Sequence, residues 1–282
     1  MKKILVFFFT LLYFTTSSAD TAKLKNDFYN ALENFLNGNF DYTDFSLKSR
    51  EDNKPEIGIL TLKPLEDLEN ELTFLQGSIF THDGDRETLN LGLGKRRLSE
   101  DESFLFGLNA FYDREIDYNH QRGSLGGEIK SSILELNANN YFSISDQRVG
   151  KNDVIEEVAD GYDLEIGSHI PHVPSAKIYA KIFEYEIPGG SDFEGMEYSS
   201  SIDVPNSGVN FEVGFKNFGN NSYDDQWFFN LTFSLNKVNP DKEFVTEEAY
   251  EKTSMKEKKY AKVRRENIIV KSKGFAVKAG GF

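Results

Sequence analysis

The sequence predicts an all-β protein, a 12-stranded antiparallel transmembrane β-barrel, and two observations lead to this fold class. The first is that apolar and polar residues alternate in one short segment after another. The clearest apolar row, which we expect to face lipid, consists of Trp227, Phe229, Leu231, Phe233 and Leu235. Polar residues and glycine fill the other row of such segments, which is typical of a barrel with lipid outside and a wet lumen.

Composition is the second observation. Aromatic residues make up 14% of the chain and 25 residues are Phe, yet the mean hydropathy is −0.50 and the net charge is −14. Apolar side chains must therefore be concentrated on particular faces, as they are in barrels with aromatic girdles at both membrane interfaces.

The first 19 residues read as a secretory signal peptide and indicate a protein exported to the bacterial outer membrane. Lys2 and Lys3 precede an apolar run from Ile4 to Phe14, and Ser17 to Ala19 offer a small-residue cleavage site. This run is too short to span a bilayer, and no other stretch approaches the roughly 20 apolar residues of a membrane helix. A helical membrane protein is therefore excluded. The absence of cysteine fits an exported protein without disulfides.

A short periplasmic amphipathic helix is expected next, within residues 20–38. Its apolar residues have helical spacing, and Asn37-Gly38 supplies a stop signal. The apolar residues are Leu24, Phe28, Ala31, Leu32, Phe35 and Leu36.

The barrel is expected over residues 39–237, because about 12 segments there have the roughly ten-residue length of a tilted membrane strand. The expected strands cover residues 39–49, 55–65, 71–81, 86–96, 102–113, 121–131, 132–144, 160–170, 175–187, 193–204, 208–217 and 225–237. The longest connection is Ser145 to Ala159, and the longer connections fall on one side. This asymmetry is typical of short periplasmic turns and longer outer loops.

Residues 238–282 are expected to form a linker or plug segment. Glu247 to Arg265 is rich in helix formers, with acidic residues early and basic residues late, so this stretch predicts a helix. From Met255 onward, nine basic residues stand against two acidic ones, a net of +7, which leaves −21 for the rest of the chain. A basic tail thus follows an acidic body.

Four motifs occur in order along the strands: Leu89–Arg96 (LNLGLGKR), Gly107–Asp113 (GLNAFYD), Leu125–Glu128 (LGGE) and Asn139–Phe142 (NNYF). A fifth, Arg265–Val270 (RENIIV), lies beyond the last strand. Together they resemble the β-domain of inverse autotransporters, the intimin and invasin family. The resemblance covers nearly the whole chain after the signal peptide.

This resemblance implies a 12-stranded outer-membrane barrel whose linker turns back through the lumen. It further implies that the barrel is a translocator or anchor that delivers a passenger, usually a string of immunoglobulin-like adhesion domains, to the cell surface. Only Gly274 to Phe282 follow Lys273, and residues 20–37 leave no room for a peptidoglycan-binding module. We therefore expect a translocator without a folded passenger, with a role in surface display or adhesion.

Charge patterning predicts a plugged barrel. An acidic lumen would hold the basic linker by charge complementarity in a partly desolvated space. The alternative interpretation of the basic residues is that they form a solvated tail outside the lumen. The acidic lumen candidates are Glu135, Asp163, Glu165 and Glu212, and the linker candidates are Lys259, Lys262, Arg264 and Arg265.

The sequence predicts no catalytic, cofactor or metal site. Among the four histidines only His169 and His172 are close in sequence, and no cysteine is present to complete a zinc site. Asp83 to Asp85 resemble a fragment of a calcium loop without its distal ligands, which is more typical of a polar turn. No Ser, His and acid triplet stands out, so we expect that the protein is not an enzyme.

Two alternatives remain open at this point. One is a small porin-like or structural outer-membrane barrel, and the other is a periplasmic or outer-membrane hydrolase. The expected partners are outer-membrane lipid, lipopolysaccharide, the barrel-assembly machinery and a surface ligand of unknown identity, with no nucleic acid.

Overall fold

The computed structural model describes residues 42–51, 54–235, 245–250 and 252–272. The expected signal peptide and the expected helix within residues 20–38 lie outside the described residues. Within the described ranges, no helix is both long and apolar enough to cross a membrane.

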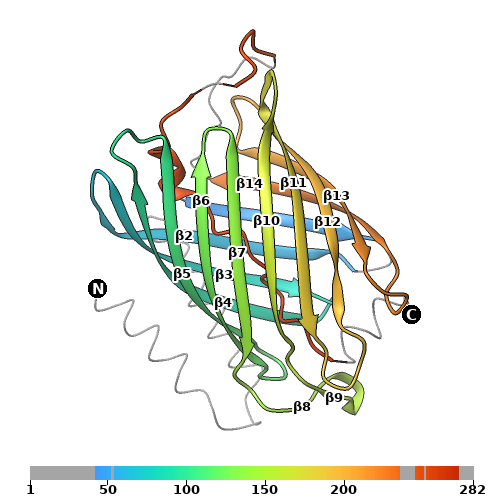
Figure 1. The fold of residues 1–282 in the computed structure, drawn as a ribbon. Helices are drawn as coiled ribbons and strands as arrows, with labels where there is room; N and C mark the ends of the chain where they lie inside the picture. Colours follow the sequence, from blue (N-terminus) through green and yellow to red (C-terminus); the bar gives the residue numbers. More distant parts are fainter. Residues whose placement is uncertain (1–41, 52–53, 236–244, 251, 273–282) are drawn as a thin grey trace. The chain divides into compact units, whose positions relative to one another are not determined.

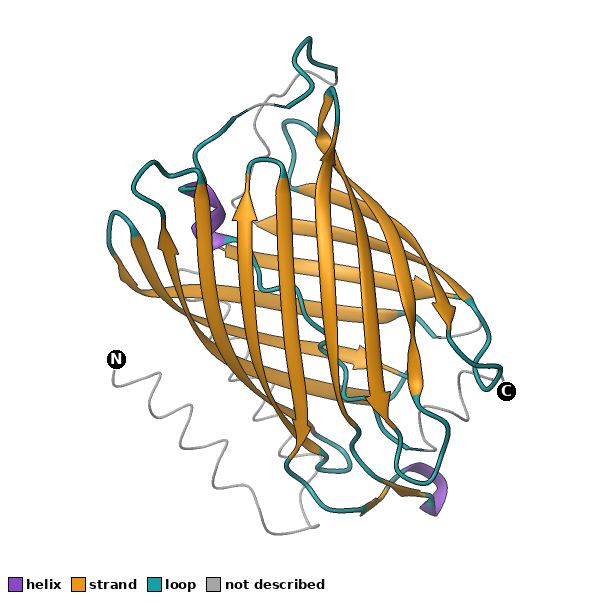
Figure 2. Ribbon diagram, viewed as in Figure 1, coloured by secondary structure: helices purple, strands orange, loops and turns teal. Residues whose placement is uncertain are grey.

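Twelve antiparallel strands close into one barrel, which confirms the predicted fold class (Figures 1 and 2). Consecutive barrel strands pair with each other, and β1 closes the barrel against β14 in a register from Thr43 opposite Leu235 to Arg50 opposite Phe228. The barrel strands are β1 (Tyr42–Arg50), β2 (Glu56–Asp67), β3 (Glu71–His82), β4 (Arg86–Leu98), β5 (Phe104–Glu115), β6 (Gln121–Ser131), β7 (Leu134–Ser143), β10 (Asp160–Ile170), β11 (Val173–Glu186), β12 (Phe193–Asp203), β13 (Val209–Phe218) and β14 (Gln226–Leu235).

Two ends of the barrel are distinguished by their connections. We call the end at which β1 begins and β14 ends the near end, and the opposite end the far end. Short turns at the near end join β2 to β3, β4 to β5, β6 to β7, β10 to β11 and β12 to β13. The remaining connections lie at the far end, including the loop between β7 and β10. This loop carries the small hairpin of β8 (Arg148–Val149) and β9 (Ile155–Glu156), with the 3-10 turn η1 (Lys151–Asp153) between them (Figure 1).

In the structure, the alternating apolar and polar residues lie on the outer and inner faces of the barrel wall. Trp227, Phe229, Phe233 and Leu235 expose 58%, 43%, 47% and 38% of their surface, and Leu231 is partly exposed. Because consecutive residues of a strand point to opposite faces, the intervening residues line the lumen. The outward row is the apolar belt that a barrel presents to lipid.

Two strand glycines have a packing role inside the barrel. A β-carbon on Gly92 would lie 2.3 Å from Cε1 of Phe111, and one on Gly94 would lie 2.3 Å from Cζ of Phe74. Only a residue without a β-carbon leaves room for these buried rings against the wall.

The predicted linker helix over Glu247–Arg265 is wrong. In the described part of this stretch the only helical element is a single 3-10 turn, η2 (Glu257–Tyr260), and the chain continues as an irregular segment through the barrel interior to Ser272 (Figure 2). We call Ala261–Ser272 the lumen segment. A helix satisfies its own backbone groups, whereas here side chains of the barrel wall take over that role.

Candidate functional site

The lumen segment and the wall around it form the candidate functional site. Before it enters the lumen, the chain contacts turns of the near end. The Thr246 amide donates to the His172 carbonyl in the β10–β11 turn at 2.9 Å, and the Met255 amide donates to the Glu102 carbonyl in the β4–β5 turn at 2.9 Å. The C-terminal chain therefore runs past several near-end turns before it turns inward.

Lys259 and Tyr260 hold the chain at the β2–β3 turn. The Lys259 ammonium donates to Asp67 Oδ1 at 2.9 Å and to the Leu68 carbonyl at 2.8 Å. The Tyr260 ring stacks on Tyr42 with centroids 4.5 Å apart and an interplanar angle of 3°. This pair joins the start of the barrel to the start of the lumen segment.

Arg264 is held by two acidic residues of the wall. Its guanidinium donates to Glu165 Oε1 at 2.6 Å, to Glu165 Oε2 at 3.0 Å and to Glu212 Oε1 at 3.1 Å. The same guanidinium lies 3.9 Å from the ring centroid of Tyr179. A forked, planar cation thus meets carboxylates on β10 and β13 and an aromatic face on β11.

Arg265 points to a different part of the wall and binds Asp113. Its two terminal nitrogens donate to Asp113 at 2.8 and 2.6 Å, and Asp113 is fully buried. Asp113 also accepts hydrogen bonds from Arg122 at 2.9 Å and from Asn90 at 2.8 Å. A buried carboxylate is stable only when its lone pairs are satisfied in this way.

The backbone of the lumen segment is bound by side chains as well. Arg96 donates to the Lys259 and Ala261 carbonyls at 2.6 and 2.5 Å. Arg122 donates to the Glu266 and Ile268 carbonyls at 2.7 and 3.1 Å. Backbone groups buried away from water require partners, and these two arginines supply them for a chain that has no strand partner here.

Amide and hydroxyl side chains of the wall complete this pattern. Asn90 donates to the Asn267 carbonyl at 2.9 Å and Asn139 donates to the Arg264 carbonyl at 3.0 Å. The Tyr141 hydroxyl accepts from the Glu266 amide at 2.7 Å and the Gln76 side chain accepts from the Val263 amide at 2.9 Å. The inner face of the barrel is thus a binding surface for an extended polypeptide.

A polar cavity of about 220 Å³ remains beside the lumen segment. Its wall includes the cationic side chains of Lys48, Arg50 and Lys181, and the lumen segment contributes Glu266. The wall of the cavity also contributes the carboxylates of Glu197 and Glu212, and the segment also contributes Arg264, so charges of both signs from the segment and the wall lie together here.

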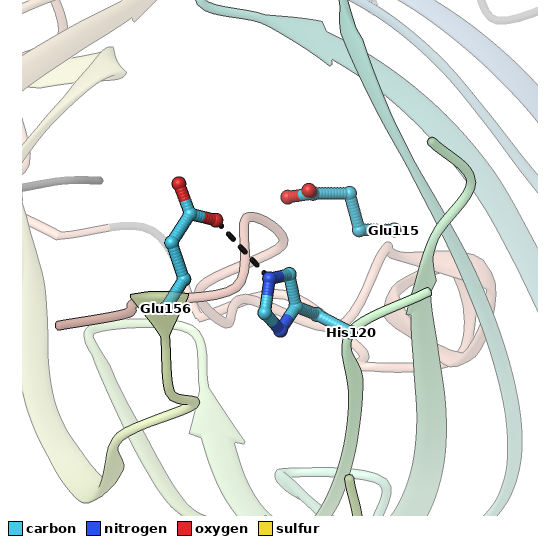
Figure 3. Close-up of side chains that lie close together, drawn as sticks. All are labelled: Glu115, His120 and Glu156. Atoms are coloured by element: carbon cyan, nitrogen blue, oxygen red, sulfur yellow. Dashed lines mark hydrogen bonds and ion pairs between the residues drawn. The ribbon is translucent and has the colours of Figure 1, made fainter. Parts of the chain in front are cut away.

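At the far end, Glu115, His120 and Glu156 lie close together in a buried cluster (Figure 3), and Lys271 of the lumen segment contacts it. The Lys271 ammonium donates to Glu115 at the end of β5 and lies 3.8 Å from Glu156 Oε2. Arg86 donates to both oxygens of Glu156 at 2.8 Å, and Nε2 of His120 lies 3.1 Å from Glu156 Oε2.

The charges of this cluster balance. Burial by itself raises the pKa of the Glu156 carboxyl, but the hydrogen bond from His120 and the charges of Lys271 and Arg86 hold that pKa at about 2. Glu115, His120 and Glu156 bring one potential ligand atom each within 4.8 Å of one another. Arg86 and Lys271 already neutralise the two carboxylates, so the arrangement is an ion-pair network and not a metal centre.

The lumen and linker residues predicted from the sequence bind different partners in the structure. Glu165 and Glu212 bind Arg264 directly, whereas Glu135 pairs with Lys177 of β11 and Asp163 accepts from the Tyr141 hydroxyl at 2.6 Å. Of the linker candidates, Lys262, Arg264 and Arg265 belong to the lumen segment. Lys259 lies at the β2–β3 turn, and Lys262 donates to the Tyr42 carbonyl near the start of β1 at 2.6 Å.

Sequence reasoning missed Arg96, Arg122, Asn90, Asp113 and Tyr141. Asn90, Arg96, Asp113 and Tyr141 lie within the strand motifs that carried the family resemblance, and Arg122 lies three residues before one of these motifs. Their position in inward rows was a usable signal, but their partners depend on the path of a segment more than 100 residues away in sequence.

Comparison with known proteins decides the family. A family model described as "Inverse autotransporter, beta-domain" matches residues 15–267. The chain belongs to the inverse autotransporter β-domain family. The family and the closed barrel place this β-domain in the bacterial outer membrane.

Curated relatives of this inverse autotransporter β-domain are longer proteins. It is 32% identical over 133 residues to the "Putative attaching and effacing protein homolog" of Escherichia coli K12, covering 46% of this chain and 42% of that protein. It is 31% identical over 141 residues to "Invasin" of Yersinia enterocolitica, covering 49% of this chain and 16% of that protein. The chain thus matches less than half the length of either relative.

A solved structure shares the fold of this inverse autotransporter β-domain. A membrane-protein structure described under the words "Unveiling the Mechanism Behind the in-meso Crystallization of Membrane Proteins" aligns with a TM-score of 0.68 and 20% identity. The alignment covers 82% of this chain and 99% of that one.

Proposed function

We propose that this protein anchors in the outer membrane and conducts its own C-terminal segment through the barrel lumen to the cell surface. In this proposal residues 1–19 are the export signal, the near end faces the periplasm and the far end faces the outside. The barrel acts as translocator and anchor, and the proposal includes no catalytic step.

The observation that carries the proposal is the fit between the lumen segment and the wall. Carbonyl groups of the segment accept hydrogen bonds from Arg96, Arg122, Asn90 and Asn139 along its course. Its arginines find carboxylates on separate strands. A barrel whose inner face satisfies an extended backbone is suited to hold a polypeptide in transit and to close around it afterwards.

We propose surface attachment as the role of the polypeptide that the segment carries outward. The support is the names of the relatives, which refer to attachment and invasion. We further propose outer-membrane phospholipid and lipopolysaccharide as contacts of the exposed apolar belt, and the barrel-assembly machinery as the partner that inserts it. The support for these partners is the outward row of β14.

Epitope tags on intact cells test the orientation. A tag after Phe282 should be labelled by antibody without permeabilisation, as should a tag at the exposed Asn221 in the far-end loop between β13 and β14. A matched tag at the exposed Asn206, in the near-end turn between β12 and β13, should be labelled only after permeabilisation. If the tag after Phe282 behaved like the tag at Asn206, the translocator proposal would fail.

A further inference from the structure

We propose that the far end of the barrel contains a docking site for one extended tripeptide, an apolar residue followed by lysine and serine, which fixes where the C-terminal segment stops in the lumen. The site, which we call the far-end dock, comprises Glu115, Glu156, Glu157, Val158 and Ala159. Its occupant is Val270-Lys271-Ser272. This inference rests on the proposed function, in which the segment passes through the lumen from the near end.

Backbone pairing provides the frame of the far-end dock. The Ala159 amide donates to the Val270 carbonyl at 3.0 Å, and the Ser272 amide donates to the Glu157 carbonyl at 2.8 Å. Val158 and Lys271 form an antiparallel β-bridge between these two bonds. The end of the β7–β10 loop therefore receives the chain as one strand receives another, a mode that fixes register through main-chain hydrogen bonds.

The first position of the tripeptide requires an apolar side chain. Val270 is 2% exposed and packs in an aromatic cluster at the far end of the lumen. Members of this cluster are Tyr141, Ala159, Phe183, Tyr185, Ile187, Phe193, Phe218 and Tyr223. A charged residue at this position would lose its hydration without gaining a partner.

The second position requires a slender cation. Lys271 is 2% exposed, and its ammonium lies between Glu115 and Glu156. Without Lys271, these two carboxylates would keep the guanidinium of Arg86, with the imidazoles of His82 and His120 beside them. The wall thus carries two carboxylates and one guanidinium before Lys271 arrives. A single positive charge from the segment completes the balance, whereas an apolar residue would leave a buried negative charge.

The third position recognises a hydroxyl group. Ser272 Oγ accepts a hydrogen bond from the Glu157 amide at 2.9 Å. Seven residues later the sequence offers a second apolar-lysine pair, Val277-Lys278, but Ala279 follows and has no hydroxyl. Of the two candidate stopping points, only Val270-Lys271-Ser272 therefore offers a hydroxyl group at the third position.

Register makes the far-end dock selective along the segment. Side chains of an extended chain alternate in direction, so a slip by one residue exchanges the faces. A slip outward by one residue would place Val270 between the carboxylates, and a slip inward would place Lys271 among the aromatic rings. Both outcomes bury a group in the wrong environment, so the dock opposes sliding in both directions.

Hydrogen exchange in the purified full-length barrel tests the far-end dock. The decisive variant exchanges two residues, V270K/K271V, so that composition and net charge stay the same while the order changes. We expect exchange at the Ser272 and Ala159 amides to increase at least tenfold in this variant and in Lys271→Gln. In Lys262→Gln, which alters the segment at the near end, exchange at these two amides should stay as in the wild type.

Two outcomes would overturn the far-end dock. One is wild-type protection of Ser272 and Ala159 in V270K/K271V. The other is an equal loss of protection in Lys262→Gln, which would mean that the whole segment loosens as a unit. Heat-modifiable electrophoretic mobility confirms in each variant that the barrel has folded. Failure of the proposed function is seen separately, because it appears as an inaccessible tag after Phe282 in the wild type.

Discussion

At the scale of single residues, the lumen is organised by a few shared charges. Asp113 binds Arg265 of the segment and Arg122 of the wall, and Glu165 and Glu212 share Arg264. The charge pattern predicts the arginines and the two glutamates, because a basic tail and an acidic polar row are both visible in sequence. Asp113 and Arg122 were not predicted, since inward residues of either sign occur in many strands and only the path of the segment selects among them.

Replacing Arg265 by Met should weaken docking of the lumen segment by about 2 kcal/mol, because charged hydrogen bonds are lost while Asp113 keeps Arg122 and Asn90. The measurement is the protection of the Ile268 and Val270 amides against hydrogen exchange. In the background of Asp113→Asn the same replacement should cost clearly less, since the two residues are coupled. Equal costs in both backgrounds would contradict the assigned pairing.

The far-end ion pairs predict a specific response to acid. The folded pKa of Glu156 is about 2, below its ordinary value of 4.5, so its contribution is complete above pH 4.5 and disappears as the pH falls through about 2. Protection factors of Ser272 and Ala159 should therefore stay constant from pH 7 to pH 5 and fall below pH 4.5. Arg86, His120 and Lys271 face the Glu156 carboxyl, and His82, Arg86 and Lys271 face the neighbouring carboxyl of Glu115.

The matched variant for this response is Glu156→Gln, which should show lower protection at pH 7 and a flatter dependence on acid. A fall in wild-type protection already between pH 7 and pH 6 would assign the response to the histidines instead.

At the scale of elements, the strands follow closely from the sequence. The expected segment 160–170 coincides with β10, and the expected segment 86–96 ends two residues before the end of β4 at Leu98. Alternation over ten residues is a strong signal because lipid and lumen impose opposite demands on neighbouring side chains. The β8–β9 hairpin was not predicted, since its two-residue strands are too short to show any period.

The linker shows why local propensity is insufficient. Glu247–Arg265 contains helix formers and well-placed charges, but propensity is a weak preference that tertiary contacts override. Here Arg96, Asn90 and Asn139 bind carbonyl groups of this stretch and of the residues just after it, groups that a helix would keep for itself. The sequence of the segment alone does not contain these partners.

The assignment of β14 side chains to the lipid face or the lumen face leads to a prediction. Leu231→Arg should impair membrane assembly, since a lipid-facing arginine near the bilayer midplane costs about 2 to 4 kcal/mol. Thr232→Arg places the same side chain on the lumen cavity, where Thr232 lies, and should be tolerated better. Assembly is measured as the heat-modifiable fraction in outer-membrane preparations. Equal fractions for both variants would reverse the facing assignment.

At the scale of the whole molecule, the barrel wall surrounds the lumen segment, and this arrangement predicts a plugged pore. Deletion of all residues after Asp241 should leave the barrel folded and raise its single-channel conductance in planar bilayers, because the lumen segment is removed. Lys262→Gln, which keeps the segment, is the matched control and should conduct like the wild type. Unchanged conductance after the deletion would favour the porin-like alternative, in which the C-terminal residues do not close the pore.

The double partnership of Asp113 bears on the order of assembly. Because Arg122 lies on β6 and already neutralises Asp113, closing the strands does not leave the Asp113 carboxylate without a cationic partner. Arg265 then joins a pair that is balanced without it. The cylinder can be completed while its interior is still filled with water, and the segment can enter later without any strand having to open.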